Sequence, residues 1–97
     1  MALDRLNILG RVWSVVWEAL PGLCGQSDHG QGRITVSPDL DSHLTRDTLL
    51  HEVMHSILRM QGHVYTKHEE QYVNSLATGL ISVLDDNPKL RKYLRAD

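Results

Sequence analysis

Two histidines one helical turn apart, with a glutamate beside the first, are the feature of this sequence with the clearest chemical meaning. They form the segment His51-Glu52-Val53-Met54-His55. In a helix, side chains four positions apart lie on the same face, so both imidazoles can reach one ion. Zinc accepts imidazole nitrogens and lowers the pKa of its water to about 7. Glu52 can reach that water without binding the ion, and we expect it to act as the general base.

A catalytic zinc site needs a third protein ligand. The sequence offers five candidates, which are His29, His63, His68, Glu69 and Glu70. His68 points away from the apolar stripe of its expected helix, and we interpret it as a surface residue. His63 directly follows Gly62, which should end the helix of the motif. His29 belongs to a glycine-rich loop and stays an open alternative.

The two glutamates flank the centre of the apolar stripe of the second expected helix, one on each side, so periodicity does not choose between them. Thr66 and Glu69 have the spacing of a capping box, in which the glutamate reaches back to the backbone N–H of the N-cap residue. That role leaves Glu70 on the inner face, where a carboxylate needs a partner such as zinc. We therefore predict His51, His55 and Glu70 as metal ligands.

Helical periodicity governs the second half of the chain. A first helix is expected from an N-cap at Thr45 to about Gln61, with Gly62 as the left-handed residue after its end. Its expected buried face is Leu50, Val53, Met54, Ile57 and Leu58. A second helix should run from Thr66 to Asp86 with the apolar stripe Val73, Leu76, Ala77, Leu80, Ile81 and Leu84. Pro88 should begin a short third helix capped by Asn87, whose solvated face carries Lys89, Arg91, Lys92 and Arg95.

The first half of the chain reads as strand and loop. Residues 10–17 are rich in β-branched and aromatic side chains, with Trp13 and Trp17 as expected core residues. Residues 22–32 contain four glycines and predict a loop, and residues 32–37 alternate polar and apolar side chains like a strand. A third strand could come from the N-terminal residues. The predicted fold class is α+β, a small antiparallel β-sheet packed on the helix of the motif and on a second antiparallel helix.

With Glu70 on the helix after His51-Glu52-x-x-His55, the chain resembles the gluzincin branch of zinc peptidases. It is most similar to the reduced form found in minigluzincins, the ImmA/IrrE family and short phage-encoded metallopeptidases. Leu49-Leu50 before the motif is typical of these families, as are Asn74, Leu76 and Ala77 after Glu70. The resemblance covers roughly residues 10 to 86 and implies a zincin-like fold that hydrolyses peptide bonds.

The resemblance also implies how a peptide or protein substrate would bind. The strand Arg33–Ser37 would be an edge strand that pairs with an extended substrate by β-augmentation. Tyr65, Tyr72 and His63 are candidates for stabilising the oxyanion that develops during hydrolysis. Asn74 would orient the carboxylate of Glu70.

Composition sets limits on the class of protein. Ninety-seven residues fit one domain, residues 1–97, and a net charge of −2 makes a nucleic-acid partner an unfavourable hypothesis. Cys24 is the only cysteine, which excludes an internal disulfide and a thiolate zinc cluster. The sequence shows neither a signal peptide nor a membrane span, and the expected location is the cytoplasm. The oligomeric state is left open.

Two other functions are compatible with these features. A zinc-stabilised binding module would keep the metal for folding and bind a partner protein through the sheet edge. A metal-free helical hairpin would carry the two histidines on its surface. Glu52 favours the catalytic hypothesis over the binding module, because a purely structural site has no use for a base beside its water. Metal analysis would distinguish the metal-free hairpin from both.

Overall fold

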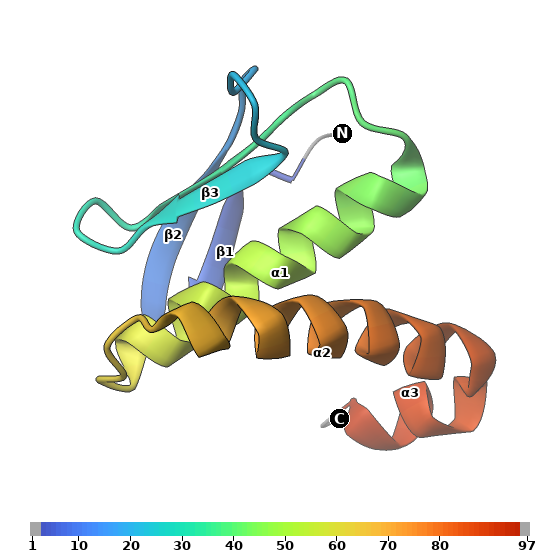
Figure 1. Ribbon diagram of the computed structural model, residues 1–97. Helices are drawn as coiled ribbons and strands as arrows, with labels where there is room; N and C mark the ends of the chain where they lie inside the picture. Colours follow the sequence, from blue (N-terminus) through green and yellow to red (C-terminus); the bar gives the residue numbers. More distant parts are fainter. Residues whose placement is uncertain (1–2, 96–97) are drawn as a thin grey trace.

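The structure is a computed structural model that describes residues 3–95, and its strands all precede its helices along the chain (Figure 1). Four strands come first: β1 (Arg5–Ile8), β2 (Arg11–Trp17), β3 (Gly25–Asp28) and β4 (Arg33–Val36). Three helices follow: α1 (Ser42–Met60), α2 (Lys67–Asp86) and α3 (Pro88–Leu94). The predicted α+β class is confirmed.

The sheet is mixed rather than wholly antiparallel, which corrects the prediction. Its strand order is β1-β2-β4-β3, with β2 and β4 parallel and the two outer pairs antiparallel. The expected third strand from the N-terminal residues is β1. The predicted loop over residues 22–32 contains β3, and β3 is an edge strand. Strand β4, which was expected at the edge as Arg33–Ser37, lies between β2 and β3.

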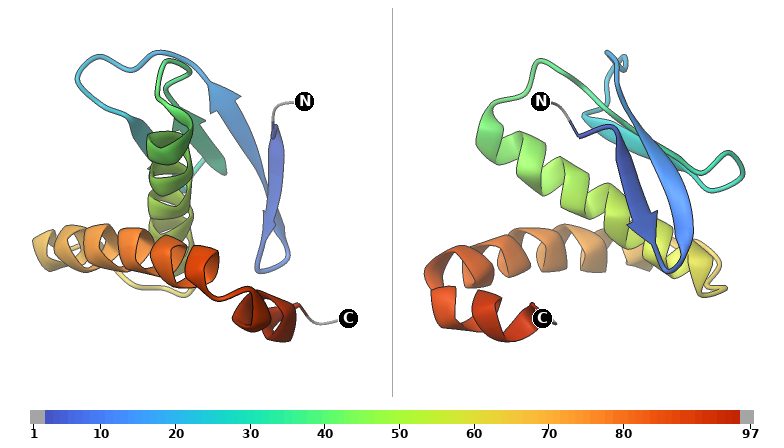
Figure 2. Two further views of the ribbon diagram at one scale, coloured as in Figure 1. Left: turned by 90° about the vertical axis from the view of Figure 1, so that its right-hand side faces the viewer. Right: turned by 180° about the vertical axis from the view of Figure 1, so that it is seen from behind.

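One face of the sheet carries the core. Trp13, Ile34 and Val36 are fully buried in a cluster with Ile8. The other face is exposed at positions such as Val12, because successive side chains of a strand point to opposite sides. Helix α1 lies across the covered face, as Figures 1 and 2 show. The helix packs on the cluster with Leu49, Val53, Ile57 and Met60.

The N-cap of helix α1 lies four residues before the predicted one, Thr45. Asp41 is the N-cap, and its carboxylate accepts a hydrogen bond of 2.8 Å from the backbone N–H of Leu44. Thr45 lies inside the helix, and its hydroxyl donates to the Asp41 carbonyl oxygen. The predicted end is confirmed. Gly62 has a φ of 87°, and its N–H donates to Arg59 O while the N–H of His63 donates to Leu58 O, the pair of bonds that defines a Schellman motif.

Helix α2 runs back beside α1 and crosses it (Figure 2). It buries Val73, Ala77 and Ile81, whereas Leu76 and Leu80 of the predicted stripe are exposed. The predicted stripe was therefore too wide, because α2 packs mainly against α1 and only a narrow line of its residues faces that helix. Near the start of α1 and the end of α2, Arg46 forms an ion pair with Asp85 and joins the two helices.

Helix α3 begins at Pro88 as predicted, and its basic face is exposed. The side chain of Asn87 does not cap the helix but donates to the carbonyl oxygen of Val83. Arg91 donates to the Leu84 carbonyl oxygen and so holds the turn between α2 and α3. Among the residues described here, no helix is long and apolar enough to cross a membrane.

Candidate metal centre

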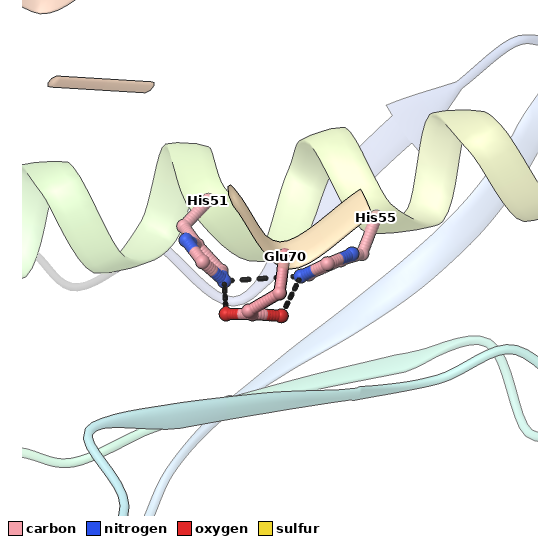
Figure 3. A group of neighbouring side chains, drawn as sticks. All are labelled: His51, His55 and Glu70. Atoms are coloured by element: carbon pink, nitrogen blue, oxygen red, sulfur yellow. Dashed lines mark hydrogen bonds and ion pairs between the residues drawn. The ribbon is translucent and has the colours of Figure 1, made fainter. Parts of the chain in front are cut away.

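Helix α1 and the start of α2 bring together the three predicted ligands. The Nε2 atom of His51 lies 2.8 Å from Glu70 Oε1, and the Nε2 atom of His55 lies 3.0 Å from Glu70 Oε2. The two Nε2 atoms are 3.0 Å apart. Figure 3 shows both imidazoles turned toward the same carboxylate, which reaches them from α2. His51, His55 and Glu70 therefore form one group whose ligand atoms lie within 4.8 Å of one another and could hold a metal ion.

The chemistry of these donors fits a cation. The Nδ1 atom of His55 lies 2.6 Å from Glu69 Oε2. A carboxylate can only accept, so this nitrogen carries the proton. In a neutral ring Nε2 then presents its lone pair to a Glu70 oxygen at 3.0 Å, and two acceptors at that distance repel each other. A bound cation converts this repulsion into two favourable contacts.

Glu69 does not take the capping role that the sequence suggested. Its carboxylate is buried between His55 and Arg59, and Thr66 has no side-chain capping bond. Glu70 does belong to the group that could hold a metal ion, although the capping argument that led to it was wrong. Burial alone would raise the pKa of the Glu69 carboxyl, but hydrogen bonds from His55 and Arg59 outweigh that effect and hold the pKa below its ordinary value.

Glu52 lies beside the three ligand residues and is not one of them. Its side chain is 9 % exposed, and its Oε2 atom is 4.0 Å from His51 Nε2. Burial raises the pKa of the Glu52 carboxyl above its ordinary value, and the nearby Glu70 carboxylate adds to the rise. The histidines and the Ser27 hydroxyl act in the opposite direction. A carboxylate of raised pKa in a hollow is a suitable proton acceptor.

The centre opens into a cavity of about 500 Å³. Edge strand β3 forms one wall through Gly25, Gln26 and Ser27. The remaining lining residues are Trp13, Leu23, His29, His51, Glu52, His55, Arg59, Tyr65 and Glu70. A second hollow of about 280 Å³ continues past the ligands beside Leu44, Asp47 and Asn74. The ligand atoms therefore face a space much larger than one water molecule.

The structure separates the other residues singled out in the sequence. His29 lines the cavity and lies against Trp13, but it is not part of the ligand group. His63, His68 and Tyr72 line a different groove, between α1 and α2. Of the oxyanion candidates only Tyr65 lines the cavity, with its ring centroid 5.9 Å from that of His55. Asn74 shares the smaller hollow with Glu70.

Two residues of the site were missed from the sequence, and the role of a third was misassigned. Ser27 belongs to a strand with no apolar alternation, so nothing marked it. Arg59 looked like a solvent-facing helix residue, although its position just before a short helix connection was a usable signal. Glu69 was weighed as a third ligand and assigned to helix capping, whereas its carboxylate contacts His55 and Arg59. The resulting ion pair joins the last turn of α1 to the first turn of α2.

Comparisons with protein-family models, with curated proteins and with solved structures find no match for this chain.

Proposed function

We propose that this chain is a zinc-dependent peptidase that hydrolyses a peptide bond with Glu52 as general base. One observation carries the proposal: three ligand atoms converge at the floor of a cavity of about 500 Å³, with a buried carboxylate beside them. Structural zinc sites are enclosed by protein ligands, whereas catalytic sites keep a position open. A site built only for folding would need neither this space nor this acid.

Zinc is the ion that this donor set favours. Two imidazole nitrogens and one carboxylate oxygen from His51, His55 and Glu70 are the two-histidine, one-glutamate combination of catalytic zinc sites. When bound there, zinc would polarise the scissile carbonyl group and make a water molecule acidic enough to attack it at neutral pH.

Glu52 would handle the protons of the reaction. Its carboxylate takes one proton from the attacking water, and it gives this proton to the amine that leaves when the C–N bond breaks. Burial raises the pKa of the Glu52 carboxyl above its ordinary value, which makes the carboxylate a stronger proton acceptor than an exposed glutamate. Ser27 of β3 lines the same cavity as Glu52, and its hydroxyl acts to lower the pKa of the Glu52 carboxyl against the effect of burial.

Strand β3 would bind the substrate main chain. It is the sheet edge that lines the cavity, and its outer backbone groups are available to an added strand. This assignment replaces the earlier expectation for Arg33–Ser37, because β4 is paired on both sides. A peptide or protein segment in extended form is thus the proposed substrate.

The test compares zinc-loaded wild type with Glu52→Gln on a library of synthetic peptides, with cleavage read by mass spectrometry. We expect cleavage to fall by about 10²–10⁴-fold, the typical contribution of a general base, while zinc content stays at one ion per chain. Glu18→Gln, at an exposed glutamate outside the cavity, is the control. Equal cleavage by wild type and Glu52→Gln would refute the assigned role of Glu52. No cleavage by the zinc-loaded wild type would refute the peptidase and leave a zinc-stabilised binding module.

A further inference from the structure

The imidazole of His55 is held between two consecutive glutamates of α2. Glu69 Oε2 lies 2.6 Å from Nδ1, and Glu70 Oε2 lies 3.0 Å from Nε2. Adjacent residues on a helix point about 100° apart, so they can reach opposite edges of one ring only if that ring lies between them. The start of α2 thus fixes both nitrogens of this histidine.

Glu69 is held in turn by Arg59. The second carboxylate oxygen, Oε1, accepts a hydrogen bond from Arg59 Nη2, so each oxygen of Glu69 has a separate partner. The Glu69 side chain is 8 % exposed, and a carboxylate this buried is stable only when its oxygens are satisfied. Arg59 belongs to the last turn of α1 and Glu69 to the first turn of α2. The ion pair therefore spans the connection between the two helices.

We propose that Glu69 and Arg59 are positioning residues of the metal centre: Glu69 keeps the proton of His55 on Nδ1, so that Nε2 faces the ion, and Arg59 keeps Glu69 in place. The proposal rests on the metal site of the proposed function and not on peptidase activity. A histidine ligand whose other nitrogen donates to a carboxylate has a fixed tautomer and a fixed ring orientation. Since Glu70 directly follows Glu69, the same ion pair also sets the position of the third ligand.

A first measurement needs no variant. Imidazole ¹⁵N and ¹H spectra of the zinc-loaded wild-type protein report which nitrogen of His55 carries the proton. We expect a protonated Nδ1 with a downfield, slowly exchanging proton. A His55 ring protonated on Nε2, with the ion on Nδ1, would overturn the proposal even if every variant failed to fold.

The second measurement is zinc affinity, determined by competition with a chelator. Glu69→Gln keeps the shape of the side chain but removes its charge, and we expect the dissociation constant for zinc to rise by about 10–100-fold. Arg59→Met should also raise the dissociation constant for zinc. The control Glu18→Gln should leave it unchanged. An affinity of Glu69→Gln within about twofold of wild type would overturn the proposal.

The two measurements together separate positioning from a merely structural role. In Glu69→Gln the downfield His55 signal should be lost or shifted, while the His51 signal stays unchanged, because the Glu69 oxygens are engaged by His55 and Arg59 alone. A variant that is less stable to heat, yet keeps its His55 signal and its zinc affinity, would show that the ion pair only joins the helices and would refute the proposal. If no peptide is cleaved by any form of the protein, both measurements still give their answer.

Discussion

Gly25 of β3 lies so close to Thr48 of α1 that a Cβ atom added to it would stand 2.7 Å from Thr48 Cγ2. The same atom would be 3.2 Å from Glu52 Cγ and 3.2 Å from the carbonyl oxygen of Thr35. Real Cβ atoms do not approach other atoms to 2.7 Å, so a larger residue at position 25 forces the strand or the Thr48 side chain to shift. Gly25 thus lets the cavity wall lie directly against the helix that carries the motif.

We predict that Gly25→Ala lowers the free energy of unfolding by about 1–3 kcal/mol, the usual cost of overpacking, and also lowers zinc-dependent cleavage because Glu52 is displaced. Urea unfolding measures the first effect. Gly79→Ala is the matched control, since a Cβ there meets nothing within 4 Å; in a helix interior it should add about 0.5–1 kcal/mol of stability. A Gly25→Ala protein as stable as wild type would contradict the contact.

The helices and the shared face of the two histidines could be predicted from the sequence because their signals are local. The spacing of His51 and His55 places them on one face of any helix, and Gly62 ends α1 through its own left-handed backbone. Pro88 begins α3 for a similarly local reason.

The sheet could not be predicted as well, because strand order depends on contacts far apart in the sequence. The four residues of β3, Gly25–Asp28, are all polar or glycine, and an edge strand with no buried apolar side chain has no periodic pattern to read. Strands β3 and β4 form an antiparallel hairpin, and it is the second strand of this hairpin, β4, that pairs with β2 in parallel. No local sequence pattern encodes which strand of the hairpin lies next to β2.

Glu69 shows how a tertiary partner overrides a local motif. Thr66 and Glu69 have capping-box spacing, yet the carboxylate is used by His55 and Arg59 instead. A charge-assisted hydrogen bond in a buried position is stronger than a bond to a solvent-exposed backbone N–H. The sequence alone does not reveal that Arg59 and His55 are within reach.

Zinc should stabilise the folded protein because His51, His55 and Glu70 converge only in the folded chain. At a free zinc concentration 100-fold above the dissociation constant, mass action adds about 2.7 kcal/mol to the free energy of unfolding. Differential scanning fluorimetry should therefore show a zinc-dependent rise in Tm for wild type, and nearly none for His51→Ala or Glu70→Ala. His68→Ala, at an exposed histidine in the first turn of α2, should behave like wild type. An undiminished rise in Glu70→Ala would exclude that residue as a ligand.

Stability should depend on pH through Asp85. Its hydrogen bond from Arg46 is 2.6 Å long and holds the pKa of the Asp85 carboxyl below the ordinary value of 3.8. A carboxyl whose pKa is lower in the folded state stabilises the fold above its unfolded pKa, and this contribution disappears as the pH falls through the folded value. Asp85→Asn should thus be less stable than wild type near pH 7, with the difference vanishing in acid.

The control for Asp85 is the neighbouring variant Asp86→Asn, which removes the same charge from the last turn of α2 and so has the same effect on the helix dipole. Only Asp85→Asn loses the Arg46 partner. Chemical denaturation across the pH range measures both variants, and about 1 M salt should shrink the difference because the pair is exposed. Identical dependence of stability on pH in the two variants would show that the ion pair adds nothing to the stability of the fold.

Tyr65 should stabilise the oxyanion formed when water attacks the scissile carbonyl group, a prediction that depends on the proposed peptidase activity. Its ring lines the cavity, and the centroid of this ring lies 5.9 Å from the centroid of the His55 ring. The guanidinium of Arg59 lies 5.7 Å from the centroid of the same ring and favours one placement of it. We expect Tyr65→Phe to lower kcat by about 10²–10³-fold, the cost of losing one oxyanion donor, with little change in KM.

Tyr72→Phe is the matched control, since it removes the same hydroxyl group from a tyrosine in the groove between α1 and α2, outside the cavity. Its kcat should equal that of wild type, and neither tyrosine variant should change zinc affinity, because neither hydroxyl belongs to the ligand group. A fall in kcat for both variants would indicate a general effect on the helix pair. A fall in neither would refute the role of Tyr65 and leave the oxyanion to the ion and to other donors that border the cavity, such as backbone N–H groups of β3.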